Sequence, residues 1–328
     1  MEQVTIGIDI AKDAFEIALL SATDGELLGQ RSYANTRAGR RRFVEAARGY
    51  DDAHIVMEAT GNYHLRLSKT LLDAGLKQSV VNPLQIKRFS EMKLRRVKTD
   101  RSDAVLIARY GQEQQPGEDT PPNTAQAKLK QISTLIDQLT KQQTALKNQK
   151  HATDQLPDSA AVCEEIIDEQ LQALKENIDK LKAEQEHLAE EQFTHVKELI
   201  SSVKGVGART TCALLAYVGD LSSFDTHKQL SAFIGLNPVV KQSGNSEKAA
   251  HISKQGHAKL RALFYMGAQS ARKHNTTCRK LYERLRAKGK AKKVALIAVA
   301  NKLVKQVFAV VKSQTLFDNH YQKKSFAT

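Results

Sequence analysis

The sequence predicts an α/β domain with a mixed sheet over residues 1–115, a helical coiled-coil segment over 125–199, and a mostly α-helical region over 200–328. Three observations predict this division. β-Branched apolar stretches alternate with helical patterns in the first region, leucine and isoleucine recur at helical spacing in the second, and positive charge gathers in the third. A chain of 328 residues also exceeds one ordinary hydrophobic core.

The first region begins with three expected strands and continues as alternating helix and strand. Apolar stretches on both sides of "DIAKD" indicate two paired strands, and "LLGQRSYAN" indicates a third after the turn "TDGE". The stretches "TRAGRRRFVEAARGY" and "NYHLRLSKTLLDAG" predict helices, whereas "AHIVMEAT" and "KQSVVNP" predict strands. A further helix opens at Thr99 or Asp100. This order is typical of an α/β domain with a mixed sheet.

The second region follows the turn-rich break "GQEQQPGEDTPPN" and contains no glycine and one proline, Pro157. Apolar residues recur at intervals of three, four and seven on both sides of that proline. The pattern predicts two long helices, as an antiparallel hairpin or a coiled coil. Such a stripe is usually core or a dimer seam, so we expect no chemistry from it and predict self-association through this segment, as a dimer or tetramer.

The third region holds a Gly-x-Gly turn and most of the positive charge. The formal net charge is +14, and residues 241–328 contain 20 Lys and Arg against three acids. Residues 126–200 instead contain nine Lys and Arg against 14 acids. Positive charge concentrated in one region predicts a polyanion-binding surface, with a solvated surface as the alternative. The stretch "LISSVKGVGARTTCALLAYVG" has the form of a helix-hairpin-helix, whose backbone N–H groups can approach a phosphate.

Composition excludes several other classes of protein. No uninterrupted apolar run reaches the roughly 20 residues that span a bilayer, and the first residues do not resemble a signal peptide. Cys163, Cys212 and Cys278 lie far apart, without the spacing of a zinc site or a disulfide framework. Aromatic residues make up 5% of the chain and tryptophan is absent, which argues against base stacking as the main mode of binding. We expect a protein of the reducing cytoplasm.

Four acids in the first region predict a metal site. Asp9 lies inside the apolar run "TIGIDIA", and Glu58 follows "HIVM" at the expected end of a strand. A buried carboxylate without a partner is costly, so each should have a cation nearby. Asp100 and Asp103 project from one side of the same helix. Asp13 is a fifth candidate, but its place in an expected hairpin turn makes it a turn residue as readily as a ligand.

Convergent carboxylates are the ligands that Mg²⁺ prefers, and two such ions about 4 Å apart can activate a nucleophile on a phosphodiester. For the pair Asp100 and Asp103 in isolation, an N-cap at Thr99 or Asp100 is an equally good explanation. Together with Asp9 and Glu58, the pair predicts that all four acids are catalytic and bind metal, most simply two Mg²⁺ ions. The surrounding Arg95, Arg96, Lys98 and Arg101 would then receive phosphates.

These motifs resemble a known family. The stretches "GIDIAKD", "MEATGNY" and "KTDRSDA" resemble the DEDD, RuvC-like catalytic domain of a group of bacterial insertion-sequence transposases. The stretches "GVGARTTCALLAYVGD", "FIGLNPVVKQSGNS" and "ISKQGHAKLRALFY" resemble that group's second conserved block. The resemblance covers nearly the whole chain, in order. It implies an RNase H-like fold for the first domain and DNA cleavage and rejoining as the activity. The group includes Piv-type invertases and recombinases guided by a bridge RNA.

The resemblance also implies a catalytic serine within "KQSGNSEK", with Ser243 as first choice and Ser246 as second. From the residues alone, a serine beside Gly244 is more often part of a turn. A serine hydroxyl needs a base or a metal to become a nucleophile, so the second block would have to reach the acids. A covalent phosphoserine would conserve the bond energy for rejoining to another strand.

The expected partners are double-stranded DNA as donor and target, together with a structured guide RNA that the resemblance implies. Two alternatives stay open: a RuvC-like, structure-selective nuclease that uses water, and a basic nucleic-acid-binding protein without catalysis. We expect a bacterial, nucleoid-associated protein. Besides the four cations near Asp100, the residues expected to contact nucleic acid are Lys204, Gly205, Gly207, Arg209, Lys241, Lys254, His257, Lys259 and Arg261.

Overall fold

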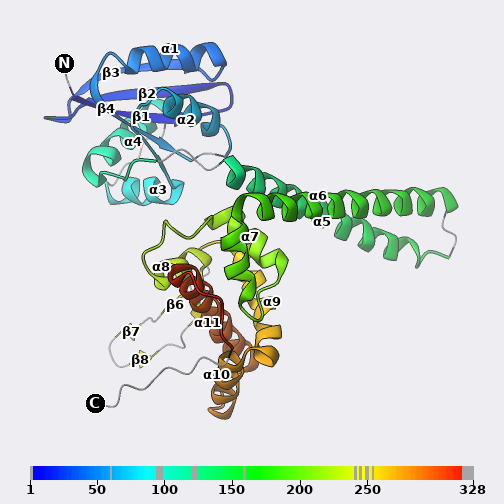
Figure 1. Ribbon diagram of the computed structural model, residues 1–328. Helices are drawn as coiled ribbons and strands as arrows, with labels where there is room; N and C mark the ends of the chain where they lie inside the picture. The colour runs from blue at the N-terminus through cyan, green and yellow to red at the C-terminus, as the bar shows by residue number, and fades with distance from the viewer. Residues whose placement is uncertain are drawn as a thin grey trace, which may run out of the picture. The chain divides into compact units, whose positions relative to one another are not determined.

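The chain forms two compact units, Met1–Pro122 and Asn123–Thr328. The computed structural model describes residues 3–59, 61–93, 99–119, 124–157, 160–239, 242–243, 246–247, 251–252 and 255–319. Figure 1 shows the first unit as a sheet with helices on both faces and the second unit as an assembly of helices.

A mixed five-stranded sheet forms the centre of the first unit. Its strands are β1 (Gln3–Ile10), β2 (Ala14–Ser21), β3 (Leu27–Ala34), β4 (Asp51–Glu58) and β5 (Gln78–Val81). They lie in the order β3-β2-β1-β4-β5. The first three strands are antiparallel neighbours, whereas β4 runs parallel to β1 and β5 runs parallel to β4. The mixed sheet predicted from the sequence is confirmed, and it fits an RNase H-like domain.

Alternation along the strands divides the unit into two apolar layers. Ile6, Ile8 and Ile10 of β1 pack with Phe43 of α1 (Arg37–Ala47) and Leu67 of α2 (His64–Asp73). On the other face, α3 (Pro83–Met92) and α4 (Asp100–Gln114) cover the sheet. Because side chains alternate along a strand, the neighbours of Ile8 on β1, Gly7 and Asp9, point to the face that α4 covers.

The helix α3 is absent from the sequence-based prediction, which ends the preceding strand at Pro83 and expects no helix until Thr99 or Asp100. The helix has the residues of a helix start. The Asn82 side chain accepts a hydrogen bond from the Leu84 backbone N–H, Pro83 occupies the first turn, and the Gln85 side chain accepts from the Asn82 N–H. Proline is favoured at that position because its nitrogen needs no helical partner.

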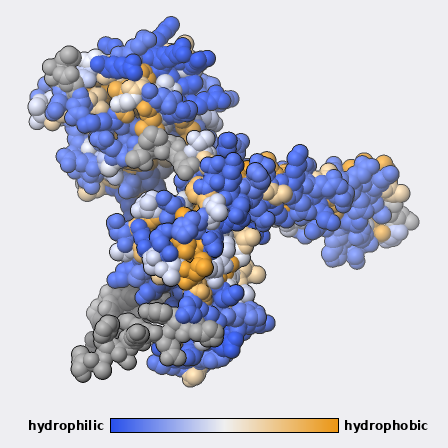
Figure 2. Space-filling model, in the orientation of Figure 1, coloured by the Kyte–Doolittle hydropathy of each residue, from blue (hydrophilic) through white to orange (hydrophobic). Residues whose placement is uncertain are grey.

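Two long antiparallel helices begin the second unit, α5 (Thr124–Thr153) and α6 (Ala161–Ser202). The two predicted helices are thus present on either side of Pro157. At their base, Leu129 of α5 and Leu188 of α6 belong to the same apolar core as the C-terminal helices. Toward the turn the apolar side chains are more exposed, Ile166 by 48% and Leu156 by 58%. Their surface is mainly hydrophilic in the view of Figure 2.

The remaining helices of the second unit are α7 (Ala208–Val218), α8 (His227–Ile234), α9 (Ala258–His274), α10 (Thr276–Ala287) and α11 (Lys292–Ser313). The sequence analysis did not predict α8, α10 or the short strands between α8 and α9. By length and composition α11 could span a membrane, but half of its apolar stretch is buried. Leu296, Leu303 and Val307 of α11 are fully buried in the apolar core, so α11 is a core helix.

Candidate active site

Asp9 and Glu58 lie on neighbouring parallel strands at the same end of the sheet. Asp9 is the penultimate residue of β1, and Glu58 is the last residue of β4. The register pairs Ile8 with Met57, so the next residue along each strand is the acid. Both acids are half-buried, and both follow a residue of the α1–α2 core. Since alternate residues of a strand point to opposite faces, both carboxylates point to the face that α4 covers.

Two glycines bring α4 close to that face. A Cβ atom on Gly7 would come within 2.2 Å of both the Ala104 carbonyl oxygen and the Ala108 nitrogen. A Cβ on Gly111 would come within 2.6 Å of the Val56 side chain and 3.0 Å of Thr5. Any larger side chain at either glycine would push the helix off the sheet.

These contacts fix the direction of α4. Gly111, near its end, lies over Thr5, and Ala104, nearer its start, lies over Gly7, so α4 runs antiparallel to β1. Asp9 follows Gly7 by two residues on β1. Asp100 and Asp103 precede Ala104 in the first turn of α4. The packing therefore places the first turn of α4 at the end of the sheet where Asp9 and Glu58 lie.

Helix capping does not require either acid of that turn. The N-cap is Thr99, whose hydroxyl accepts a hydrogen bond from the Ser102 N–H, while the Ser102 hydroxyl accepts from the Thr99 N–H. Asp100 is exposed and Asp103 is half-buried. Acids in a first turn do complement the helix dipole, which is a modest structural benefit. Asp13, the fifth candidate, is exposed in the β1–β2 turn.

The four acids share one face and one end of the sheet without forming a closed set of ligands. Among the residues that the structure describes, no three His, Cys, Asp or Glu side chains are grouped closely enough to hold a metal ion. Backbone placement thus brings the acids to a common region, but their side chains are not gathered around one point.

Arg101 is the cation near Asp100 whose contacts the structure describes. The Arg101 carbonyl oxygen accepts a hydrogen bond of 2.9 Å from the Gln30 side chain of β3, and the Arg101 Nε lies 4.0 Å from Glu16 Oε2. The Arg101 side chain is 75% exposed. Arg95, Arg96 and Lys98 lie outside the described residues, as do Lys241 and Lys254 of the second unit.

The Gly-x-Gly turn is held rigidly in the second unit. Gly205 has a φ of +106°, and a Cβ there would come within 2.6 Å of Ala271 of α9. The buried Asn275 side chain donates a hydrogen bond of 3.1 Å to the Lys204 carbonyl oxygen. Gly207 is the N-cap of α7, and Lys204, Gly207 and Arg209 are exposed. Gly205 is therefore required by packing, whereas the other three residues are open to a ligand.

Three predicted phosphate ligands have partners inside the second unit. His257 Nδ1 accepts the hydrogen bond of the Leu260 N–H that caps α9, and its ring lies 4.0 Å from the Tyr217 ring. Lys259 Nζ lies 2.8 Å from Asp137 Oδ2. Arg261 donates to the carbonyl oxygen of Ile234 at the end of α8. Each side chain thus has a structural role, whether or not it also contacts a ligand.

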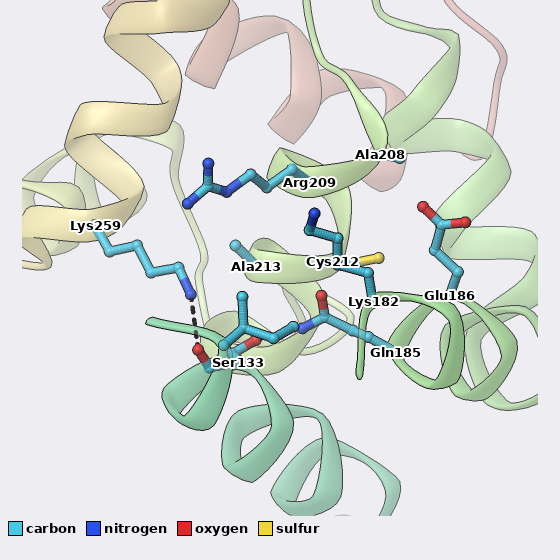
Figure 3. Close-up of a pocket in the computed structure, with 10 residues that line it drawn as sticks. Ser133, Lys182, Gln185, Glu186, Ala208, Arg209, Cys212, Ala213 and Lys259 are labelled. Atoms are coloured by element: carbon cyan, nitrogen blue, oxygen red, sulfur yellow. Dashed lines mark hydrogen bonds between the residues drawn. The ribbon is translucent and has the colours of Figure 1, made fainter. Parts of the chain in front are cut away.

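A pocket lies between α5, α6, α7 and α9, close to the Gly-x-Gly turn (Figure 3). Lys259 reaches across from α9 and donates a hydrogen bond of 3.2 Å to the Ser133 carbonyl oxygen. The Gln185 side chain donates to the Ser133 hydroxyl within it. Burial raises the pKa of the Cys212 thiol to about 11, so the thiol stays protonated at neutral pH and is not a nucleophile. These contacts connect the helices and form no catalytic arrangement.

Ser243 and Ser246 are paired by the backbone register of a short hairpin. β7 (Gln242–Ser243) pairs antiparallel with β8 (Ser246–Glu247), and the register pairs Ser243 directly with Ser246. The turn between them, residues 244–245, lies outside the described residues. Neither serine is in a helix, and the two candidates occupy equivalent positions on opposite strands.

Sequence reasoning did not select Glu16, although it lies beside the predicted acids. The register of β1 and β2 pairs Asp9 with Glu16. Its neighbours Phe15 and Ile17 belong to the α1–α2 core, so Glu16 points to the α4 face, like Asp9. The alternation in "AFEIALL" indicates the face, but the pairing with Asp9 becomes evident only when the length of the hairpin turn is known.

Comparison with known proteins identifies the family. Residues 6–155 match a family model described as "Transposase", and residues 197–283 match that of the transposase IS116/IS110/IS902 family. The pilin gene-inverting protein of Moraxella bovis is 30% identical over 97% of this chain and 98% of its own length. The chain belongs to this transposase family. The transposase for insertion sequence element IS1111A of Coxiella burnetii is 28% identical over 95% of this chain and 90% of its own length.

This transposase is a DNA recombination enzyme, as members of the family are. The first match includes all four acids, and the second includes the Gly-x-Gly turn and both serines. Family membership also agrees with the cytoplasmic location expected from the sequence. The RuvC structure from Thermus thermophilus matches 35% of this chain and 99% of RuvC, with 14% identity and a TM-score of 0.28.

Proposed function

We propose that this transposase cleaves and rejoins DNA with a divalent-metal site formed by Asp9, Glu58, Asp100 and Asp103 and with Ser243 as nucleophile. The observation that carries the proposal is the packing of α4 on β1. It brings acids from two strands and one helix to one end of one sheet face. A bound cation would relieve the mutual repulsion of these carboxylates, three of which are half-buried.

The donor set suits Mg²⁺. All four side chains offer carboxylate oxygens, the ligands that this hard cation prefers. A fifth carboxylate oxygen nearby, Glu16 Oε2, is buried and has no hydrogen-bond partner among the described residues. Because the side chains are not gathered around one point, binding would have to draw them together. Two bound Mg²⁺ ions would neutralise charge at the phosphodiester and lower the pKa of a nucleophile.

The chemical step proposed for Ser243 exchanges one phosphoester for another. Its Oγ attacks phosphorus, its proton leaves to a base or to water, and the P–O bond to the leaving strand breaks. The phosphoserine is then attacked by a hydroxyl of another strand, which restores the serine. Ser246 is the second candidate that the family resemblance implies, and it pairs with Ser243 in the hairpin. The acids and the serines belong to different units, so the step requires them to meet in the assembled enzyme.

DNA and a guide RNA are the proposed ligands of the exposed cations. Lys204, Gly207 and Arg209 are exposed around a rigid turn, and Arg101 is exposed beside the acids. His257, Lys259 and Arg261 are less available, because each has an internal partner. Contact with RNA is proposed from the family resemblance alone, as is association with the nucleoid.

Self-association through α5 and α6 is proposed from their surface. Apolar side chains such as Leu135 and Ile166 are 41% and 48% exposed on these helices. Their contact with a second copy, in a dimer or tetramer, would bring two active sites to two duplexes.

The decisive experiment uses suicide DNA that traps a covalent adduct. We expect wild-type protein with Mg²⁺ to form a phosphoserine adduct, Asp9→Asn to form none, and Ser243→Ala to form none. Asp13→Asn is the matched control for Asp9→Asn, because Asp13 is exposed in the adjoining turn, and it should keep activity.

Other outcomes would favour the alternatives. Cleavage that persists in Ser243→Ala and in Ser246→Ala, without an adduct, would indicate a nuclease that uses water. Binding without cleavage in wild-type protein, unchanged in Asp9→Asn, would indicate a nucleic-acid-binding protein.

A further inference from the structure

The proposed function leaves Glu16 on the α4 face unused, and its position is unusual. Glu16 on β2 pairs directly with Asp9 on β1, and both side chains point to the face that α4 covers. Like charges directly opposite each other on neighbouring strands destabilise a sheet. If Glu16 only packed against its neighbours, a neutral residue at this position would stabilise the sheet more. The acid at this position therefore needs another explanation.

Burial makes the charge more costly. The Glu16 side chain is 20% exposed, and its Oε2 atom is buried with no hydrogen-bond partner among the described residues. Desolvated carboxylate oxygens normally have a donor or a cation. The cation nearest to Glu16 in the described ion pairs is Arg101, with Nε 4.0 Å from Oε2. At that distance the two groups form an ion pair, but they are too far apart for a hydrogen bond.

Arg101 connects Glu16 to the proposed ligands. It lies between Asp100 and Asp103 in the first turn of α4. Its carbonyl oxygen accepts a hydrogen bond from Gln30 of β3, so the backbone of that turn is held to the sheet at the same residue. Glu16 lies within ion-pair distance of the Arg101 side chain, and Gln30 hydrogen-bonds the Arg101 backbone, so both contact the turn that carries two of the four acids.

We propose that Glu16 is a positioning residue of the acidic site, which acts through Arg101 to hold Asp100 and Asp103 in place for a divalent cation. The inference rests on the proposed function, because it assumes that the acids bind the ion. It extends that function by a residue on a third strand. The charge of Glu16 is costly for the fold and useful only when the first turn of α4 must be oriented.

The test measures Mn²⁺ affinity by isothermal titration calorimetry on the full-length protein, and thermal stability in EDTA. Glu16→Gln should weaken Mn²⁺ binding by about tenfold, a common effect of losing a partner behind the ligands. Its melting temperature in EDTA should stay unchanged or rise, because a buried charge opposite Asp9 is gone. A residue with a merely structural role would lower stability and leave Mn²⁺ affinity unchanged.

A double-mutant cycle with Arg101→Gln tests the connection. If Glu16 acts through Arg101, the double variant should bind Mn²⁺ no more weakly than the worse single variant. Glu45→Gln, an exposed acid on α1, is the matched control and should bind Mn²⁺ like wild type. Additive losses, or Mn²⁺ affinity of Glu16→Gln within about twofold of wild type, would overturn the proposal.

Mn²⁺ binding by Asp9→Asn distinguishes a failure of the Glu16 proposal from a failure of the proposed metal site. Wild-type protein that binds no Mn²⁺, or Asp9→Asn that binds it undiminished, would overturn the acidic site itself. Normal binding by wild type, loss in Asp9→Asn and no change in Glu16→Gln would overturn only the role of Glu16.

Discussion

Gly7 of β1 lies so close to Ala104 of α4 that a Cβ atom on Gly7 would come within 2.2 Å of the Ala104 carbonyl oxygen. The obstructing atom belongs to the backbone, so no side-chain rearrangement could relieve the clash. Since α4 carries Asp100 and Asp103 in its first turn, the distance between strand and helix decides how near those acids come to Asp9.

Gly7→Ala should therefore damage both the fold and the site. Inserting a methyl group into a contact of this kind costs about 1–3 kcal/mol in the free energy of unfolding. We also expect Mn²⁺ affinity to fall, because α4 must move away from the sheet. Chemical denaturation measures the first effect and calorimetry the second.

Gly29→Ala is the control for that substitution. Gly29 lies in β3 of the same sheet, and nothing lies within 4 Å of a Cβ atom built on it. It should leave Mn²⁺ affinity unchanged. If Gly7→Ala also kept full affinity, the placement of α4 would not control the acidic site.

A second prediction concerns the buried Asn275, which connects three parts of the second unit. Its amide nitrogen donates hydrogen bonds to the Lys204 carbonyl oxygen and, at 3.0 Å, to Gln306 Oε1 of α11. Its Oδ1 accepts the N–H of Cys278 at the start of α10. Asn275→Ala leaves several buried polar groups without partners, at about 1–3 kcal/mol for each. We expect a large loss of stability in urea denaturation.

The control is Asn177→Ala, which changes an exposed asparagine on α6 and should cost little stability. Stability of Asn275→Ala equal to that of the control would show that the polar network contributes nothing net. The turn that carries Lys204 and Arg209 should also exchange its amide hydrogens faster in Asn275→Ala.

The sequence predicts well the parts of the fold that depend on local pattern. Apolar stretches and the turns between them predict all five strands of the first unit, and apolar residues at helical spacing predict α5 and α6. The sequence-based prediction lacks α3 because Pro83 also suits the end of a strand, although Asn82 and Gln85 form a capping box around it. Local signals there supported two interpretations, and tertiary packing on Val81 and Tyr110 favours the helix.

Site residues were harder to predict when their role depends on a distant partner. Asp9 and Glu58 stand out because each acid lies in an apolar stretch, and Asp100 and Asp103 stand out because they share one side of a helix. Glu16 was missed because its significance comes from register with Asp9. Lys259 was selected for its charge, but the ion pair with Asp137 of α5 joins elements far apart in the sequence. No local pattern reveals such a pairing.

His54 of β4 provides a prediction of pH dependence. Its Nε2 lies 2.8 Å from the Ser79 hydroxyl of β5, which in turn bonds the carbonyl oxygens of Pro116 and Gly117. Burial lowers the pKa of His54 from its ordinary value of 6.5. A lowered folded-state pKa means that the unfolded chain binds the proton more readily. The stabilisation is therefore complete above pH 6.5 and is lost as the pH falls through the folded-state pKa.

Hydrogen exchange at the β5 amides should accordingly quicken as the pH falls below 6.5, after correction for the intrinsic pH dependence of exchange. His54→Gln can keep the hydrogen bond to Ser79 but does not titrate, so its corrected protection should stay nearly constant over the same range. An equal loss of protection in both proteins would assign the effect to another group.

The last prediction concerns four exposed lysines in the turn after α10 and at the start of α11, Lys288, Lys290, Lys292 and Lys293. Within the part of the chain that the structure describes, none of these four forms an ion pair with an acid. Unpaired cations at one corner of a basic domain suit a phosphate backbone. Replacing all four with glutamine should weaken DNA or RNA binding and flatten its salt dependence, by about 0.9 in the log–log slope for each phosphate that the variant no longer neutralises.

The same number of charges removed elsewhere controls for net charge. Lys128, Lys141, Lys147 and Lys175 are exposed on α5 and α6, and their replacement with glutamine lowers the net charge equally. If the corner binds phosphate, its variant should show a far larger fall in affinity and slope than this control, in titrations at several salt concentrations. Equal falls in the two variants would mean that binding follows total charge and that the corner does not touch the nucleic acid.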